Sequence, residues 1–308
     1  MIEIRTGSDS DLPKIKPAFD LLDALGIPFS ARVLSAHRTP RLSSEEARNL
    51  ESNGFRVCIA AAGGAAHLPG TTAAETVIPV LGIPVSSETF GGLDALYAIA
   101  QMPDGIPVGT LGVGQAEAAA LLAAGIVGID DARIVAELRK RRKLPEMTPP
   151  ARSRIVAILK PAGAPEGKIA DLTKLLRELG VEPRDYAGTS APERDGARVI
   201  VALADEATLS SPASLAARTH LPVIGVPLAA GRLTENPYDA LLGSAPVAGM
   251  GVNRVKNAAI FAAEIVGVHD PEVRSKVRAY RESLGRDSQA KDEKLLAQGW
   301  SAYLKGMR

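Results

Sequence analysis

The sequence has little cysteine, few aromatic residues and almost no excess of charge. Cys58 is the only cysteine, so no disulfide can form within the chain, and its apolar surroundings at Val57–Ala60 predict a buried, inert thiol in a strand. Lys and Arg number 36 against 35 Asp and Glu, and this balance makes nucleic acid a poor candidate partner. Aromatic residues form 4% of the chain, which provides few rings for stacking on bases.

Long apolar runs and metal-binding clusters are also missing. The apolar run Ala118–Val127 is broken by glycine and is shorter than the roughly 18 residues that span a bilayer. Met1–Arg5 alternates like a half-exposed strand and lacks the order of a signal peptide. We therefore expect no membrane segment and a cytoplasmic location. No His, Cys or carboxylate group has convincing metal-ligand spacing, so we predict no metal and no cofactor.

What the sequence does contain is an alternation of short strand-like and helical runs. The chain has 308 residues and 46% hydrophobic content, enough for two ordinary domains. Alternating elements of this kind predict an α/β fold with parallel sheets covered by helices. In the first half we expect strands over 2–6, 30–34, 56–61 and 107–111, and helices over 12–25, 40–53 and 115–126. Thr39 is expected as an N-cap before Pro40.

The order of elements begins again after a proline-containing linker. A charged helix over 130–143 leads into residues 144–150, whose prolines cannot continue it. Later landmarks repeat earlier ones in the same order: Gly54-Phe55-Arg56-Val57 with Gly196-Ala197-Arg198-Val199, Ile78–Val85 with Leu221–Leu228, Asp94-Ala95-Leu96 with Asp239-Ala240-Leu241, and Ala119-Ala120 with Ala258-Ala259. We predict a duplicated domain, with boundaries at 1–145 and 151–270 and a helical extension over 271–308.

Three polar segments, two of them containing glycine, follow strand candidates of the first half. They are Gly7–Asp11, Ser35–Pro40 and Ala62–Gly70. In an open parallel sheet, all three emerge at the carboxyl edge, where ligands bind. The sequence therefore predicts one site built from three loops.

Each segment has a functional and an ordinary structural interpretation. The helix start at Ser8 could hold a phosphate, with Asp11 accepting hydrogen bonds from a sugar, or could be a simple N-cap. Arg38 could pair with the phosphate or be solvated, and His37 can carry a proton near neutral pH. His67 could reach the ligand or satisfy a loop carbonyl. His220 and His269 have no such company, so they are interpreted as structural or exposed.

Together these segments resemble a known family. The motifs are Gly-Ser-x-Ser-Asp, Ser-Ala-His-Arg-Thr-Pro, Ala-Gly-Gly-Ala-Ala-His-Leu-Pro-Gly, and Gln101-Met102-Pro103 followed by Gly105–Leu111. In order and spacing, across residues 1 to 127, they resemble the N5-carboxyaminoimidazole ribonucleotide mutase family. This resemblance implies two flavodoxin-like three-layer α/β/α domains and an octameric arrangement of domains. It also implies a reaction that moves a carboxylate from the exocyclic nitrogen to C4 of an aminoimidazole ribonucleotide in purine biosynthesis, without metal, ATP or biotin.

The resemblance also implies roles for individual residues. His37 would shuttle the proton, assisted by His67, and the loop from Gly63 to His67 would shelter the imidazole and the released carbon dioxide. The residues implied in substrate binding are Ser8, Ser10, Asp11, Ser35, Ala36, Arg38, Ala62, Gly63, Gly64, Ala65, Leu68 and Asn257. The implied partners are a ribonucleotide and carbon dioxide.

The sequence departs from the family pattern at several positions. Ala61 stands where glycine is expected, and Ala118 stands where an Asn begins an Asn-Ala-Ala stretch that the second half keeps at Asn257. The second half has Lys160–Gly163 and Thr189–Pro192 in place of the phosphate and histidine motifs, so we expect it to be inactive on its own. Asn257 is expected to complete the first site across a domain interface or to pin its own repeat.

Four such chains would form an eight-domain homotetramer, with the tail from Arg274 to Arg308 packing on neighbouring chains or remaining solvated. The alternative functions are a carboxylase that adds free carbon dioxide to aminoimidazole ribonucleotide, a non-catalytic nucleotide-binding or assembly protein, and a carboxylase of another heterocycle.

Overall fold

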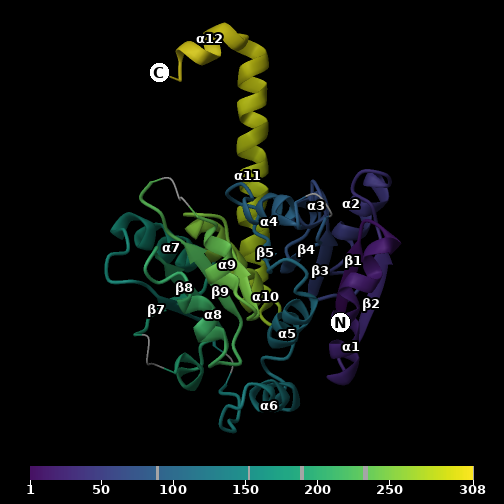
Figure 1. The fold of residues 1–308 in the computed structure, drawn as a ribbon. Coiled ribbons are helices and arrows are strands. Elements are labelled where there is room, and N and C mark those ends of the chain that lie inside the picture. The colour runs from purple at the N-terminus through teal and green to yellow at the C-terminus, as the bar shows by residue number, and fades with distance from the viewer. Residues whose placement is uncertain (88–89, 152, 188–190, 232–234, 308) are drawn as a thin grey trace.

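A computed structural model describes residues 1–87, 90–151, 153–187, 191–231 and 235–307. Its first half contains a five-stranded parallel sheet, because runs of apolar residues in this half are buried on both faces (Figure 1). The strands are β1 (Ile2–Thr6), β2 (Phe29–Val33), β3 (Val57–Ala62), β4 (Val80–Pro84) and β5 (Gly109–Thr110), in the spatial order β2-β1-β3-β4-β5. This order places the ends of β1, β2 and β3 side by side.

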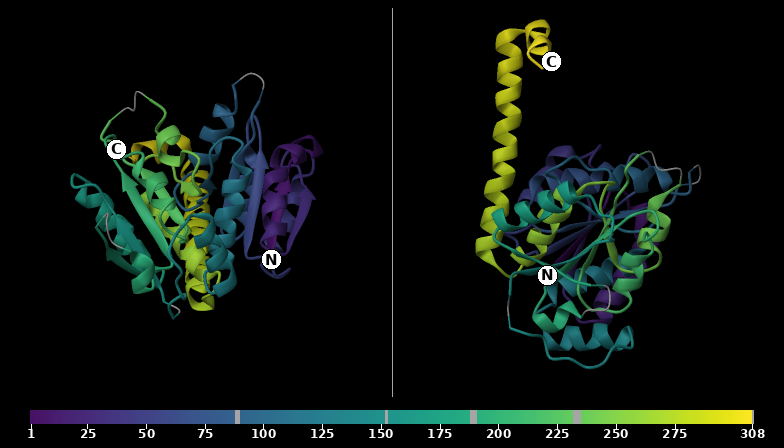
Figure 2. Two further views of the ribbon diagram at one scale, coloured as in Figure 1. Left: turned by 60° about the horizontal axis from the view of Figure 1, so that its bottom comes forward. Right: turned by 90° about the vertical axis from the view of Figure 1, so that its left-hand side faces the viewer.

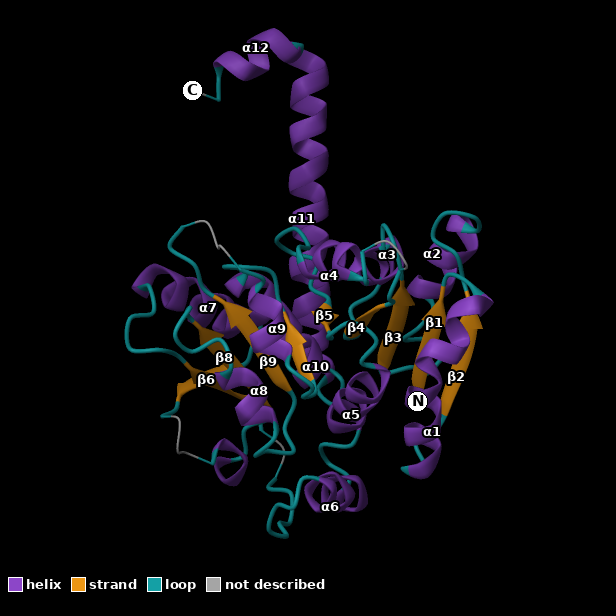
Figure 3. Cartoon of the chain, in the orientation of Figure 1, coloured by secondary structure: helices purple, strands orange, loops and turns teal. Residues whose placement is uncertain are grey.

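The second half repeats this arrangement in the same topological order. Its strands are β6 (Ile155–Leu159), β7 (Glu182–Asp185), β8 (Val199–Ala204), β9 (Val223–Pro227) and β10 (Val247–Gly249), in the order β7-β6-β8-β9-β10. The α/β class and the mostly parallel sheet are thereby confirmed (Figure 3).

The two halves share one ten-stranded sheet, whereas the sequence predicted two separate sheets. The junction is the pairing of β5 with β10, which run antiparallel with Thr110 opposite Gly249. Gly249 permits this closeness, because a Cβ atom there would lie 3.3 Å from the Thr110 carbonyl oxygen. Strand β5 has only two residues and therefore carries little sequence pattern, so the sequence did not predict the junction.

Helices cover both faces of the sheet. The helices are α1 (Leu12–Ala24), α2 (Pro40–Arg48), α3 (His67–Glu75), α4 (Leu93–Ala100), α5 (Ala116–Val127), α6 (Ala132–Arg141), α7 (Glu166–Glu178), α8 (Ser211–Ala216), α9 (Pro237–Leu242), α10 (Val255–Gly267), α11 (Pro271–Gln298) and α12 (Trp300–Lys305), with 3-10 turns at Asp9–Asp11 and Pro192–Asp195. One core cluster includes side chains from α1, α5, α7 and α10. The core on this face therefore continues from one half into the other.

The C-terminal helix has two parts with different surroundings. Near its start, Val273 and Val277 are buried against the body. Further along, α11 projects away from the sheet and carries α12 at its tip (Figures 1 and 2). The expected helical tail is thereby confirmed. None of the helices in the described ranges is long and apolar enough to cross a membrane.

Several local predictions can be compared with the structure. Cys58 lies fully buried in β3, and burial raises the pKa of its thiol to about 12, in agreement with an inert side chain. The strand expected over 107–111 is confined to Gly109–Thr110. Thr39 occupies the N-cap position of α2 but does not cap it, because its hydroxyl accepts instead from the Ser35 N–H at 3.1 Å.

Each half also sends a helix onto the other. Asp131 caps α6 and Asp270 caps α11, and each accepts hydrogen bonds from two backbone N–H groups of its helix. In the turn after α6, Arg142 donates to the Thr219 carbonyl. At the matching position of α11, Arg281 donates to the Thr76 carbonyl. The two halves therefore contact each other reciprocally.

The remaining histidines belong to such contacts. His220 is buried beside Arg139, with its Nδ1 atom 3.0 Å from an Arg139 nitrogen. Burial, reinforced by the Arg139 charge, lowers the pKa of His220 to about 4. The Nε2 atom of His269 lies 3.0 Å from the Ile126 carbonyl. Both side chains are structural, as one of the two sequence interpretations proposed.

Candidate active site

The three predicted loops meet at one cavity. They follow the carboxyl ends of β1, β2 and β3, which are adjacent in the sheet. The cavity has a volume of about 430 Å³ and is lined by Gly7, Ser8, Asp11, Ser35, Ala36, His37, Arg38, Ala62, Gly63, Ala66, His67 and Leu68. The small side chains and convergent polar groups in its wall suit a polar small molecule.

The first loop is a tight turn built by its own hydroxyls. Ser8 caps the 3-10 turn Asp9–Asp11, accepting from the Ser10 N–H at 3.3 Å. The hydroxyls of Ser8 and Ser10 lie 2.8 Å apart. Thr6, the last residue of β1, donates to Asp11 at 3.4 Å. The turn therefore presents a hydroxyl and a carboxylate at the cavity.

The second loop is fixed around Ser35. The Ser35 hydroxyl accepts from the Arg38 N–H at 3.1 Å, and the Thr39 hydroxyl accepts from the Ser35 N–H at 3.1 Å. The Arg38 guanidinium reaches the first loop, where it donates to the Gly7 carbonyl at 2.8 Å. Arg38 therefore joins two loops while its exposed side chain stays accessible to an anion.

The third loop places His67 at the start of α3. Ala66, just before it, adopts the left-handed conformation with a φ of 48°. Gly63 packs closely under the neighbouring loop, where a Cβ atom would lie 3.3 Å from the Val85 carbonyl. A non-glycine residue in the left-handed region is uncommon outside functional or tightly determined positions.

The two histidines predicted as catalytic are in contact. The Nε2 atom of His37 lies 2.7 Å from the Nδ1 atom of His67. Their ring centroids are 4.9 Å apart, with the planes inclined by 70°. Both side chains are exposed at the cavity. One ring nitrogen donates and the other accepts, so the pair can hold a proton beside a ligand.

The structure does not bring every predicted residue to the cavity wall. Ser10 supports Ser8 from behind the wall, and Gly64 and Ala65 belong to the third loop without lining the cavity. Asn257 lies in α10, and its amide is bonded to the backbone of residues 102–105. Gly7 and Ala66 line the cavity although the sequence did not single them out. Their neighbours Ser8 and His67 were the available signal.

The matching edge of the second half has different chemistry. Lys160, at the end of β6, forms an ion pair with Asp185 at 2.6 Å. Asp205, after β8, accepts from the Thr208 hydroxyl at 2.6 Å. Thr189 and Ser190, predicted to replace the histidine motif, lie outside the described residues. The polar side chains described at this edge, Lys160 with Asp185 and Asp205 with Thr208, are therefore bonded to each other.

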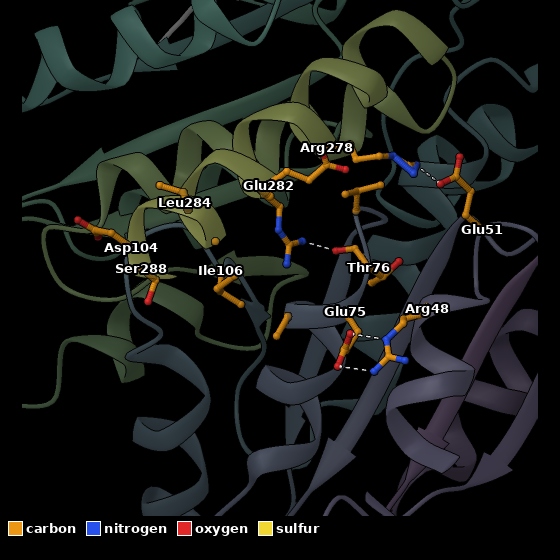
Figure 4. Close-up of a pocket in the computed structure, with 14 residues that line it drawn as sticks. Arg48, Glu51, Glu75, Thr76, Asp104, Ile106, Arg278, Glu282, Leu284 and Ser288 are labelled. Atoms are coloured by element: carbon orange, nitrogen blue, oxygen red, sulfur yellow. Dashed lines mark hydrogen bonds and ion pairs between the residues drawn. The ribbon is translucent and has the colours of Figure 1, made fainter. Parts of the chain in front are cut away.

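A larger cavity lies elsewhere, between α11 and the first half. It measures about 670 Å³ and includes Arg48, Glu75, Thr76, Arg278 and Glu282 in its wall (Figure 4). Its charged groups are largely paired, as in the contacts of Arg48 with Glu75 and of Arg278 with Glu51. In the part of the chain that the structure describes, no three His, Cys, Asp or Glu side chains are grouped as metal ligands.

The fold is that of an α/β protein, with a cavity lined by polar loops at the carboxyl edge of a parallel sheet. Comparison with known proteins is more specific, because the family model described as AIR carboxylase matches residues 1–147 and 184–287. This match covers most of the chain and includes segments of both halves. The chain belongs to the AIR carboxylase family.

Individual relatives match about half of the chain. The N5-carboxyaminoimidazole ribonucleotide mutase of Vibrio cholerae is 50% identical over 143 residues, covering 46% of this chain and 89% of the relative. The enzyme of the same name from Pyrococcus horikoshii is 48% identical over 143 residues, covering 46% of this chain and 81% of the relative. Among solved structures, PurE of Treponema denticola is 26% identical, with a TM-score of 0.41, covering 46% of this chain and 89% of that one.

Proposed function

We propose that this chain is an N5-carboxyaminoimidazole ribonucleotide mutase of purine biosynthesis, an isomerase that moves a carboxylate from the exocyclic nitrogen of its substrate to C4. The observation that carries the proposal is the meeting of His37 with Ser8, Asp11 and Arg38 at one cavity. The part of the chain that holds this cavity is 50% identical, over 143 residues, to an enzyme of that name.

The cavity wall offers a division of roles. Ser8 and Arg38 would hold the phosphate, through a hydroxyl, the turn N–H groups and a guanidinium. Asp11 would accept hydrogen bonds from the ribose. The small residues Ala36, Ala62 and Gly63 leave room for the imidazole, with Leu68 on the apolar side. Ser35 would act indirectly, by fixing the Arg38 backbone.

His37 would carry the proton in both steps. As an imidazolium it protonates the exocyclic nitrogen while the bond from nitrogen to the carboxylate carbon breaks, which releases carbon dioxide. C4 then attacks the trapped carbon dioxide, and the neutral imidazole removes the proton from C4. The proton balance closes, because the histidine returns to its starting form. His67, 2.7 Å away, would orient the His37 ring and share its proton.

A carboxylase that uses free carbon dioxide is the second candidate, favoured by the description of the matching family as AIR carboxylase. Two incubations separate the candidates. The purified chain is given N5-carboxyaminoimidazole ribonucleotide in one, and aminoimidazole ribonucleotide with bicarbonate in the other, and the C4-carboxylated product is followed. The mutase proposal expects acceleration of the first reaction alone. Acceleration of the second alone identifies the carboxylase, and acceleration of neither supports a binding or assembly protein.

The arrangement of the chain leads to a proposal about assembly. We propose boundaries at 1–145, 151–270 and 271–308, with one active site per chain, in the first unit. Four chains would then form an eight-domain homotetramer. Within each active site, carbon dioxide would remain bound between the two steps. The predicted cellular compartment is the cytoplasm. Light scattering that gives the mass of four chains of 32.1 kDa would support this assembly, whereas the mass of one chain would contradict it.

A further inference from the structure

The contacts between the two halves are largely mirrored. Arg142 and Arg281 donate to the carbonyls of Thr219 and Thr76, which stand at equivalent positions. A second pair of contacts, Arg139 with Glu193 and Arg278 with Glu51, is equivalent as well, and Figure 4 shows Arg278 facing Glu51. Because these contacts occur both between α6 and the second half and between α11 and the first half, we attribute them to the packing of the two halves against each other.

One further contact, that of Asn257 with the loop 102–105 of the first half, has no equivalent between Ala118 and the second half. Asn257 is the third residue of α10, and the equivalent third residue of α5 is Ala118. The side-chain amide oxygen of Asn257 accepts from the Gly105 N–H at 2.8 Å. The side-chain NH₂ group donates to the carbonyls of Pro103 at 2.9 Å and Met102 at 3.3 Å. The side chain is 2% exposed, so these bonds are shielded from water.

The segment that Asn257 holds is itself reduced in the second half. Residues 101–105 separate α4 from Ile106, whereas only Gly243 and Ser244 separate α9 from the equivalent Ala245. There the Gln115 side chain donates to the Gly243 carbonyl, and the equivalent residue Arg254 forms an ion pair with Asp104 of the first-half loop at 2.9 Å. The buried amide contact and the longer loop that it holds are therefore both restricted to the half that carries His37 and His67.

The loop that Asn257 bonds contacts the helix that begins at His67. Met102 packs on α3 at Gly70, where a Cβ atom would lie 2.9 Å from the methionine sulfur. Gly70 is three residues after His67, on the same side of the helix. At the other end of α3, Arg281 donates to the carbonyls of Ala73 and Thr76. Helix α3 is thus held near its start by the loop that Asn257 bonds and near its end by Arg281 of α11.

We infer that Asn257 is a positioning residue of the active site: it fixes the loop 102–105, the loop fixes α3 through Met102, and α3 sets His67 against His37. The inference deepens the proposed function and rests on it for the effect on turnover. A misplacement of about 1 Å in a reacting group can cost roughly 100-fold in rate, so a loosened α3 acts on chemistry more than on substrate binding.

The amide group gives the test its specificity. Asn257→Ala leaves three backbone groups, of which the Gly105 N–H is buried, without their side-chain partner. Asn257→Asp keeps the acceptor for Gly105 but turns an oxygen toward the carbonyls of Met102 and Pro103, so a variant of the same shape should also fail. Lys256→Ala, at the exposed neighbouring position, is the control on the same helix. Arg142→Met is the control for stability, because it removes the equivalent contact between the halves on the side away from His37 and His67.

The four histidines allow the effect to be located in the full chain. In spectra of ¹³C-labelled histidine, assigned with His37→Asn, the Asn257 variants should shift the resonances of His37 and His67. Arg142→Met should shift only His220, which adjoins Thr219. For turnover, we expect Asn257→Ala and Asn257→Asp to lower kcat by about 10- to 100-fold with KM within about threefold. Lys256→Ala and Arg142→Met should keep kcat within about twofold.

Two outcomes overturn the inference. One is an Asn257→Ala protein with unchanged kcat and unchanged His37 and His67 resonances. The other is a loss of kcat in Arg142→Met equal to that in Asn257→Ala at equal melting temperature, because the effect would then come from general loosening. If Asn257→Ala does not fold, Met102→Ala breaks the same chain of contacts and must shift the His67 resonance. An inactive wild-type protein rejects the proposed function instead, while the resonances still test the positioning.

Discussion

The Nε2 atom of His37 and the Nδ1 atom of His67 lie 2.7 Å apart, although the two residues come from different loops of the sheet edge. This contact allows one proton to be held at the cavity between two rings. It also gives the two histidines different expected roles, since His37 would exchange the proton with substrate and His67 would orient His37.

Replacing His37 should remove turnover without unfolding the protein. His37→Asn keeps a hydrogen-bonding side chain but deletes the proton carrier, and loss of a general acid and base costs roughly 100- to 10,000-fold in rate. Because the side chain is exposed, the melting temperature should change little. Steady-state assays and thermal melts check both points. Turnover close to wild type in His37→Asn would show that another group moves the proton.

Removing the Arg38 charge should act mainly on binding. The Arg38 guanidinium donates to Gly7 at 2.8 Å and would add a charged contact to the phosphate. A hydrogen bond to a charged group is worth about 1.5–3 kcal/mol, so Arg38→Ala should raise KM by roughly 10- to 100-fold with a smaller effect on kcat. The matched control is Arg41→Ala, which removes an exposed charge of the next helix. An equal rise of KM in both variants would contradict a specific phosphate contact.

Stability should depend on pH through Glu264. This carboxyl is fully buried, and burial raises its pKa from 4.5 to about 8, against the opposing effect of Arg281. A raised folded pKa means that the stabilising contribution is complete below about pH 4.5 and is lost as the pH rises toward 8. The melting temperature of the wild type should therefore fall more between about pH 5 and pH 8 than that of Glu264→Gln. Parallel curves for the two proteins would refute the assignment.

Turnover should not require a metal or a nucleoside triphosphate. The sequence contains no Walker-type Gly-Lys-Ser/Thr run, and the proposed steps need only a proton carrier and a closed cavity. Exhaustive dialysis against a chelator should leave the rate unchanged. Loss of activity that a divalent ion restores would contradict the cofactor-free site.

The sequence predicted the site better than the surroundings that support it. The three loops could be placed because glycines, hydroxyls and histidines follow strand candidates, two of which, β1 and β3, are buried along their whole length. The joining of the two sheets through β5 and β10 involves one residue pair, Thr110 with Gly249, which carries no pattern. Asn257 was expected at an interface, and its bonds go to backbone atoms of residues 102–105. Because any residue type supplies these backbone groups, the sequence could not identify the partners.

The central claim is that the first half transfers a carboxylate within a closed site, and an isotope measurement tests it most directly. The purified protein converts N5-carboxyaminoimidazole ribonucleotide, labelled with ¹³C in its carboxylate, in a large excess of unlabelled bicarbonate and with carbonic anhydrase present. The account predicts that the C4 carboxylate of the product retains the label, because carbon dioxide stays in the cavity beside His37 and His67 between the two steps. A product whose carboxylate has the isotope content of the bicarbonate pool would contradict it.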